Sequence, residues 1–283
     1  MKRFLAVCVA LITLLLAGCG SFDTMRSEFV ALRYMQEAEA NLTSYPRDTT
    51  QAIRELNRAV ALMPDDEQLR RRAARFYTSA RAYEEAIPLF EAQQDLDRQD
   101  QLAYARCLLN TGREDEGAQI CLQIISRVMK QREQSAPMQP EWALLLNDSG
   151  YILADADMHI DRAEEAVRVA VDFMPLEGAF IDSLGWALYR KGELEDAAFY
   201  LERSRRHASR EDPEILYHLG VVYARLGRYR DATEALRKAR ELEPGWDAVR
   251  KELRRLGRIL PPPVLAACRP AGTATGIDHS DQI

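Results

Sequence analysis

The chain has 283 residues, of which 47% are hydrophobic and 29% are charged, and its formal net charge at pH 7 is −6. Leu, Ala, Arg and Glu are abundant, β-branched residues are sparse, and no sustained alternation of apolar and polar residues predicts a β-strand. This composition excludes a β-rich fold, and the acidic balance argues against nucleic-acid binding, which needs a basic surface.

The N-terminus is typical of a secretory signal. Lys2 and Arg3 precede an apolar run over residues 4–16, and this run is shorter than the ~20 residues that a membrane-spanning helix needs. The next residues, Leu16-Ala17-Gly18-Cys19, resemble the lipobox of bacterial lipoproteins, in which the chain is cut before the cysteine and the cysteine is acylated.

This resemblance implies a cleaved signal peptide over residues 1–18 and a lipidated tether over residues 19–26, with Cys19 as the acylated residue. Gly20 after the cysteine implies a location on the periplasmic face of the outer membrane. More than one acyl chain would make this membrane anchor effectively permanent. The alternative is an ordinary secreted protein with a chance cysteine. Loss of the signal removes two basic and no acidic residues, which leaves a net charge of −8.

Residues 27–128 contain three copies of a spaced pattern of small and large residues. Ala52 and Ala86 are 34 residues apart, and Gly117 follows 31 residues later. Each is followed four residues later by a larger apolar residue, at Leu56, Phe90 and Cys121. A repeat of this length predicts stacked supersecondary units rather than one globular core.

An insertion follows this first block. Gly117 is 46 residues from the next small residue of the pattern, Ala163, so roughly a dozen extra residues lie near 129–141. That segment is polar and contains Pro137 and Pro140. We interpret it as a linker, an extended helix end or a hinge between two blocks of three repeats.

The pattern resumes over residues 142–258 with Ala163, Ala197 and Ala232, and a tail over 259–283 is expected to be disordered. The final copy is the most complete: Leu219-Gly220, Tyr223, Gly227, Tyr229, Ala232, Leu236, Ala239 and Pro244. These residues resemble the tetratricopeptide repeat (TPR), a hairpin of two helices. The resemblance implies an all-α, right-handed α-solenoid of about six hairpins with a C-terminal capping helix.

Each marker residue of the final copy has a physical task. Gly220 and Ala232 allow the two helices of the hairpin to approach closely. Gly227 is suited to the left-handed backbone that ends the first helix, and Pro244 prevents continuation of the second. Three stretches, 147–155, 182–192 and 217–228, also resemble bacterial envelope proteins built from such repeats.

The resemblance places a partner-binding groove on the inward faces of the first helices. Aromatic and arginine side chains at exposed concave positions are typical binding hot spots. The implied groove residues are Asn147, Tyr151, Asp182, Trp186, Tyr189, Arg190, Tyr217, His218 and Arg225. Truncation of Trp186 is then expected to cost at least ~2 kcal/mol of binding energy and to leave the fold intact.

Other interpretations of these residues stay open. Trp186 and Tyr189 would merely pack between adjacent hairpins. Alternatively, Trp186, Tyr189 and Tyr217 would bind glycan strands, with Asp182 as a polar partner. A hydrolase that uses Asp155, Asp157 or Asp182 is a third class, and it requires carboxylates that converge in a pocket. A carboxylate clamp of the kind found in chaperone-binding relatives is rejected, because Glu214 and His218 replace the basic and amide residues it needs.

A second candidate surface is basic. Arg71 and Arg75 are four residues apart and share one helical face. They would bind an acidic segment or phospholipid head groups, or form an ordinary solvated face. Cys107 and Cys121 fall at apolar positions of the third copy, either as two buried thiols or as a disulfide.

No motif for catalysis or metal binding is evident in the sequence. It lacks His-Glu-x-x-His, a glycine-rich phosphate loop and a cysteine pair with zinc spacing. The series Asp155, Asp157, His159 and Asp161 departs from a calcium loop, and Asp161 with Glu164 is expected to cap the next helix instead. We therefore expect a non-enzymatic scaffold without metal or cofactor, which binds envelope proteins or peptides and has the potential to form homo-oligomers.

Overall fold

The computed structural model describes residues 24–134 and 137–259, and these residues form thirteen helices and no strand. The all-α fold predicted from the sequence is confirmed. The predicted signal peptide, Cys19 and nearly all of the predicted tail lie outside the described residues. No helix in the described part is long and apolar enough to cross a bilayer.

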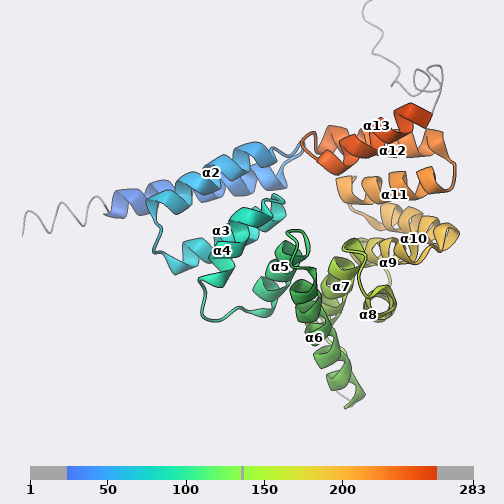
Figure 1. Ribbon diagram of the computed structural model, residues 1–283, viewed down its shortest axis with the longest axis horizontal. Helices are drawn as coiled ribbons and strands as arrows, with labels where there is room; N and C mark the ends of the chain where they lie inside the picture. The colour runs from blue at the N-terminus through green and yellow to red at the C-terminus, as the bar shows by residue number, and fades with distance from the viewer. Residues whose placement is uncertain (1–23, 135–136, 260–283) are drawn as a thin grey trace, which may run out of the picture.

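The helices pair into six antiparallel hairpins, and a single capping helix follows them (Figure 1). The first hairpin joins the helix over residues 24–43 to α2 (Thr49–Leu62). The others are α3 (Glu67–Ser79) with α4 (Tyr83–Glu91), α5 (Arg98–Leu109) with α6 (Glu114–Glu133), α7 (Pro140–Asp155) with α8 (Ile160–Phe173), α9 (Gly178–Lys191) with α10 (Leu194–His207), and α11 (Pro213–Arg225) with α12 (Tyr229–Leu242). The cap is α13 (Asp247–Ile259).

Glycine sets the close approach within the hairpins. A Cβ placed on Gly220 would lie 2.5 Å from Leu236 Cγ, and one on Gly185 would lie 2.7 Å from Leu201 Cγ. These distances are far below van der Waals contact, so only glycine allows α9 to meet α10 and α11 to meet α12 this closely. Gly227, with φ of 75°, supplies the left-handed turn after α11. The predicted roles of Gly220 and Gly227 are confirmed.

The segment 129–141 is partly helical. The helix α6 continues to Glu133, and α7 begins at Pro140, whose ring suits the first turn of a helix. The C-terminal end of α6 extends beyond the body of the solenoid (Figure 1). The extra residues therefore lengthen the second helix of the third hairpin, and α6 and α7 still pack against each other.

The core follows the solenoid as two clusters of buried side chains. One contains the buried residues of the first two hairpins together with Cys107, and the other extends from Leu102 to the cap. The two clusters meet at α5, which is N-terminal to the boundary suggested by the sequence. Cys107 and Cys121 are both free and buried, and they belong to different clusters, so they form no disulfide.

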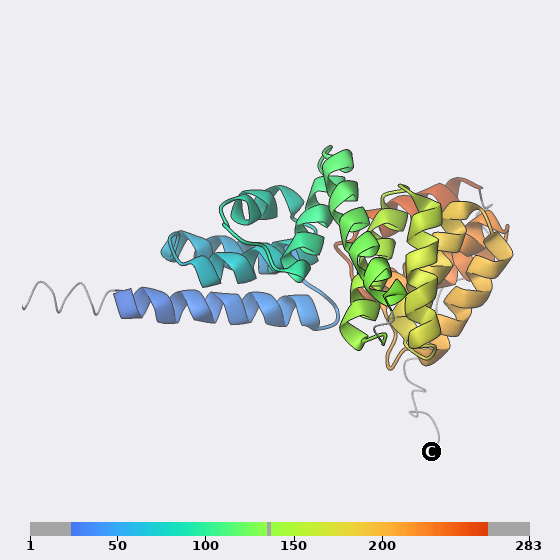
Figure 2. The same cartoon turned by 90° about the horizontal axis from the view of Figure 1, so that it is seen from below.

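The superhelix closes on itself. Figures 1 and 2 show the hairpins curling until the turn between the first two helices approaches the end of α12. The amide nitrogen of Arg47 donates to the Leu242 carbonyl oxygen at 2.9 Å. The guanidinium groups of Arg47 and Arg81 both pair with the Glu243 carboxylate, which is 1% exposed. We call Arg47, Arg81 and Glu243 the clasp.

Arg81 of the clasp also makes a stacking contact. The Arg81 guanidinium carbon lies 3.9 Å from the ring centroid of Trp246, immediately before the cap. Nearby, the Arg210 guanidinium carbon lies 4.7 Å from the ring centroid of Tyr45. Repeats in an ordinary solenoid contact only their neighbours. Here the first two hairpins also contact the last, and this closure encloses the concave face.

Candidate partner-binding groove

The concave face contains a cavity of about 870 Å³ at the centre of the closed superhelix. Its wall comes from both ends of the chain as well as from α5, α7 and α11. Charged side chains of both signs line it: Glu39, Arg47, Arg81, Arg106, Asp155, Glu214, Glu243, Asp247 and Lys251. This volume and mixed lining are suited to a polar chain segment rather than to a compact apolar ligand.

A second cavity of about 520 Å³ lies against α7, α9 and the start of α11. Three residues, Arg106, Tyr151 and Glu214, line both cavities. The two cavities are therefore neighbours on the concave face, and these three side chains separate them. Together they form the candidate groove.

The dividing residues form a connected group. The Tyr151 hydroxyl donates to a Glu214 carboxylate oxygen, and the Arg106 guanidinium carbon lies 5.2 Å from the Tyr151 ring centroid. Burial alone raises the pKa of Glu214, but His218, Arg106 and the Tyr151 hydroxyl outweigh it, so the pKa lies below its ordinary value. Burial also raises the pKa of Tyr151 well above its ordinary value. At neutral pH the group therefore contains an ionised Glu214 and a protonated Tyr151.

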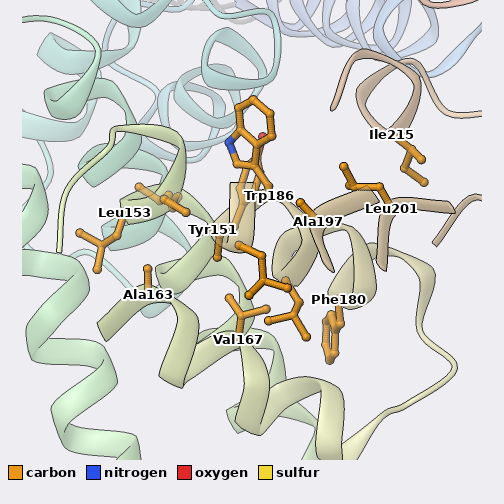
Figure 3. Packing of buried hydrophobic residues seen from close by; sticks show 14 of the residues in the cluster. Tyr151, Leu153, Ala163, Val167, Phe180, Trp186, Ala197, Leu201 and Ile215 are labelled. Atoms are coloured by element: carbon orange, nitrogen blue, oxygen red, sulfur yellow. The ribbon is translucent and has the colours of Figure 1, made fainter. Parts of the chain in front are cut away.

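An aromatic stack joins α9 to α11. The Trp186 ring centroid is 4.0 Å from that of His218 and 4.8 Å from that of Tyr189, with interplanar angles of 19° and 21°. The Arg190 guanidinium carbon lies 4.9 Å from the Trp186 ring centroid. Trp186 is only 2% exposed and is part of the larger core cluster (Figure 3). The stack is thus the interior wall of the groove rather than its exposed lining.

His218 and Asp182 form a buried pair beside this stack. His218 Nδ1 lies 2.9 Å from Asp182 Oδ2, and the two residues are 1% and 6% exposed. Burial alone lowers the pKa of His218, but the carboxylates of Asp182 and Glu214 outweigh it and the pKa is raised. Burial raises the pKa of Asp182, and His218 offsets this only in part.

The comparisons with known proteins agree with this architecture. Two segments, 71–103 and 213–246, match models of the tetratricopeptide repeat. The chain contains TPR repeats. The TPR repeat-containing protein PA4667 of Pseudomonas aeruginosa is 38% identical over 82 residues, which are 29% of this chain and 14% of that protein. The aligned part is thus a small fraction of the relative's length.

Solved structures share the TPR fold. The thermophilic TPR protein TTC0263 of Thermus thermophilus has a TM-score of 0.53 and 19% identity, covering 69% of this chain and 100% of that one. A tetratricopeptide repeat protein from Parabacteroides merdae also has a TM-score of 0.53, with 12% identity and coverage of 74% and 78%. At these identities the likeness concerns the fold alone, and the fold is a TPR solenoid.

The structure brings most of the predicted groove residues together but buries several of them. Asn147, Tyr151, Asp182, Trp186 and His218 are at most 9% exposed. The expectation that Trp186 is an exposed hot spot is wrong, because Tyr189 and His218 stack on its ring. Of the other predicted groove residues, Tyr189, Arg190 and Tyr217 are half-buried, and Arg225 is exposed.

The predicted basic pair has intramolecular partners. Arg75 donates to Asp97 Oδ2 at 2.7 Å and also pairs with Asp100, which is fully buried. Arg71 donates to the Asp95 carbonyl oxygen at 2.9 Å and to the Gln93 side chain at 3.1 Å. These contacts join α3 to the loop before α5 and to its first turn. Arg71 and Arg75 therefore hold two hairpins together, and they are not a patch of free cations.

The acidic turn before α8 also differs from its predicted role. The helix begins at Ile160 after His159, so Asp161 lies in its first turn and does not cap it. Glu164 instead pairs with Lys191 and Arg168. Within residues 24–134 and 137–259, no cluster of three or more His, Cys, Asp or Glu side chains could hold a metal ion.

Arg81, Arg106 and Glu243 are among the charged residues of the groove that the sequence did not predict. The position of Arg106 could have been recognised from the sequence, because it lies in an apolar stretch of α5 between Ala105 and Cys107, which are both fully buried. A charged residue in such a place usually has a specific partner. Arg81 and Glu243 lie at turns, where charged residues are ordinary, so only the closure of the superhelix reveals them.

Proposed function

We propose that this chain is a membrane-anchored, non-enzymatic adaptor of the bacterial cell envelope that holds an extended segment of a protein partner in its concave groove. The two adjoining cavities at the centre of the closed superhelix are the observation that carries this proposal. TPR folds generally bind protein partners, and the groove combines half-buried aromatic rings with charged groups of both signs.

The burial of Trp186 favours a protein ligand over a glycan. Glycan recognition through Trp186 requires an open ring face, and its ring is covered by His218 and Tyr189. Charged and polar side chains line both cavities instead, and their hydrogen-bond donors and acceptors suit the alternating N–H and C=O groups of a polypeptide backbone. The partner then makes its contacts mainly with half-buried residues such as Tyr217.

Site-specific photocrosslinking in cells tests the groove. A photoreactive phenylalanine analogue placed at Tyr83 or Tyr217, which both line the central cavity, should capture a small set of envelope proteins. The matched control is the same analogue at Phe199, which is 57% exposed on α10, outside both cavities. Equal capture from all three positions would refute the assignment of the groove as the docking site.

The first helix supports anchoring at a membrane. Met25, Phe29 and Leu32 are 56%, 73% and 50% exposed, and their spacing of four and three residues places them on one face. Cys19 precedes Thr24 by five residues, a length of chain that spans at most ~17 Å. An acylated Cys19 would hold this apolar face near the lipid, on the periplasmic face of the outer membrane.

Metabolic labelling with an alkyne analogue of palmitate tests the anchor. The native protein should incorporate the label and fractionate with membranes, while Cys19→Ala should do neither. Cys268→Ala, a second cysteine substitution far from the lipobox, is the control and should label normally. Labelling that persists in Cys19→Ala would exclude Cys19 as the acylation site.

A further inference from the structure

The smaller of the two cavities, which we call the acidic chamber, has an excess of carboxylates. Five acidic residues line its volume of about 520 Å³, against the two arginines Arg106 and Arg210. Asn147, Asp182 and Ser183 form its buried part on α7 and α9. Asp148 and Arg210 are exposed and lie at its rim. The chamber is therefore a recess that opens to solvent and deepens toward buried polar groups.

Some of these carboxylates already have partners. Asp212 accepts the Glu214 amide at 2.8 Å and caps α11, and Glu214 accepts the Tyr151 hydroxyl. Both arginines are also held by rings: Arg106 lies over Tyr151, and Arg210 lies over Tyr45. At the deep end, His218 pairs with one oxygen of Asp182 and leaves the other oxygen without a partner.

Two acceptor atoms at that deep end have no hydrogen-bond partner. Asp182 uses Oδ2 for His218, while its Oδ1 is buried and unpaired. Asn147 donates from Nδ2 to Asp148 at 3.1 Å, while its Oδ1 is likewise buried and unpaired. The two residues are 6% and 5% exposed. Buried acceptors without donors are costly, so the chamber is complementary to a group that brings N–H donors.

The charge around these acceptors selects a cationic donor over a neutral one. Burial raises the pKa of Asp182, and its contact with His218 offsets this only in part, so a further positive charge beside this carboxylate would stabilise its ionised form. A metal ion is a poor fit, since no group of three suitable ligands occurs in the described part of the chain. A guanidinium or ammonium group supplies several N–H donors and the charge together.

We propose that the acidic chamber receives an arginine or lysine side chain of the bound polypeptide, whose N–H groups pair with Asp182 Oδ1 and Asn147 Oδ1. This inference rests on the proposed function, because it names the residue chemistry that the groove selects in its partner. The remainder of the segment would then continue past Tyr151 and Glu214 into the central cavity. The carboxylate of Asp182 serves two roles, orienting His218 and binding the partner's cation.

Fluorescence polarisation with the full-length protein tests the proposal. The probes are pools of labelled twelve-residue peptides, randomised except for one central arginine, lysine, citrulline or glutamate. Citrulline matches arginine in shape and lacks its charge. Arginine and lysine pools should bind at least tenfold more tightly than citrulline and glutamate pools, a factor equal to about 1.4 kcal/mol. Their binding should weaken as salt is added, since the attraction is electrostatic.

Two variants and one control locate the effect. Asp182→Asn keeps the side-chain shape and turns a donor toward the chamber, so binding of the arginine pool should fall at least tenfold. Asp172→Asn is the same change at an exposed position on α8 and should have no effect. Arg210→Gln removes an exposed cation from the rim and should tighten binding of the arginine pool several-fold, without risk to the core.

The outcomes separate this inference from the proposed function. Both the cation site and the peptide-binding groove are supported if the arginine and lysine pools bind selectively, Asp182→Asn abolishes this binding and Arg210→Gln enhances it. Equal binding of all four pools, or binding of the arginine pool that neither variant alters, overturns the cation site and leaves a peptide-binding groove. Absence of binding by every pool overturns the peptide-binding groove, and the cation site with it.

Discussion

The clasp gives a prediction whose size follows from burial. Glu243 is 1% exposed, whereas the side chains of Arg47 and Arg81 are 26% and 29% exposed. Substitution of both arginines by methionine leaves a buried carboxylate without a cation, which typically costs ~3–5 kcal/mol. Glu243→Gln instead leaves two guanidinium groups that water still reaches, so its cost should be smaller, ~1–2 kcal/mol.

This cost should appear as opening of the superhelix rather than as unfolding of the hairpins. The clasp joins the first two hairpins to the last, while each hairpin keeps its own contacts with its neighbours. Small-angle X-ray scattering should show a larger radius of gyration for the Arg47→Met/Arg81→Met variant, with helical circular dichroism unchanged. Urea unfolding should rank this double variant below Glu243→Gln. The reverse ranking, or scattering profiles identical to the native one, would refute the reasoning.

Three further predictions concern single sites. Gly220→Val should destabilise the fold by ~1–3 kcal/mol in thermal melts, because the valine side chain would overlap Leu236. Gly257→Val is the control, since a Cβ at Gly257 meets no atom within 4 Å, and it should lose far less stability than Gly220→Val. The raised pKa of His218 adds folding stability that is fully present below pH ~6.5 and is lost as the pH rises through the pKa of the folded state. His218→Asn should therefore flatten this part of the plot of stability against pH. An unchanged plot would contradict the role of His218. Burial raises the pKa of Cys107 to about 11 and that of Cys121 to about 12, so both thiols should resist iodoacetamide until the protein is denatured, and rapid native alkylation would show them exposed.

The repeat pattern was sufficient to predict the fold because hairpin geometry depends on local steric rules. Gly220 opposite Leu236 and Gly227 at a left-handed turn are each specified by size and backbone freedom within a few residues. The ends of the helices were harder to predict from the sequence, because capping depends on backbone angles as well as on residue type. Asp161 has a good capping side chain, yet α8 starts at Ile160, after a left-handed residue at His159.

Predictions about the site depended on curvature, which no local pattern encodes. Arg71 and Arg75 share a helical face, as expected, but the loop before α5 supplies acidic partners at Asp97 and Asp100. The clasp likewise requires contact between residues 196 positions apart, as between Arg47 and Glu243. Such contacts follow from the summed rotation of six hairpins, so residues that look exposed on one repeat become internal partners in the assembled superhelix.

Trp186 shows how this burial changes the interpretation of a variant. Its ring is 2% exposed and stacks on His218 across the interface between α9 and α11. Trp186→Ala should therefore cost ~3–5 kcal/mol of folding stability, measured by urea unfolding, in addition to any loss of partner capture. Trp186→Phe keeps one ring against His218 and should lose much less.

The matched comparison is with Tyr217, which is half-buried and lines the central cavity. Tyr217→Ala should weaken partner capture with a smaller loss of stability than Trp186→Ala, because less of its surface is withdrawn from water. If Trp186→Ala were as stable as the native protein, the stack would not hold α9 to α11. Trp186→Ala can lose partner capture either through lost stability or through a lost partner contact. The loss is assigned to a partner contact only if Trp186→Phe, which keeps its stability, also loses partner capture.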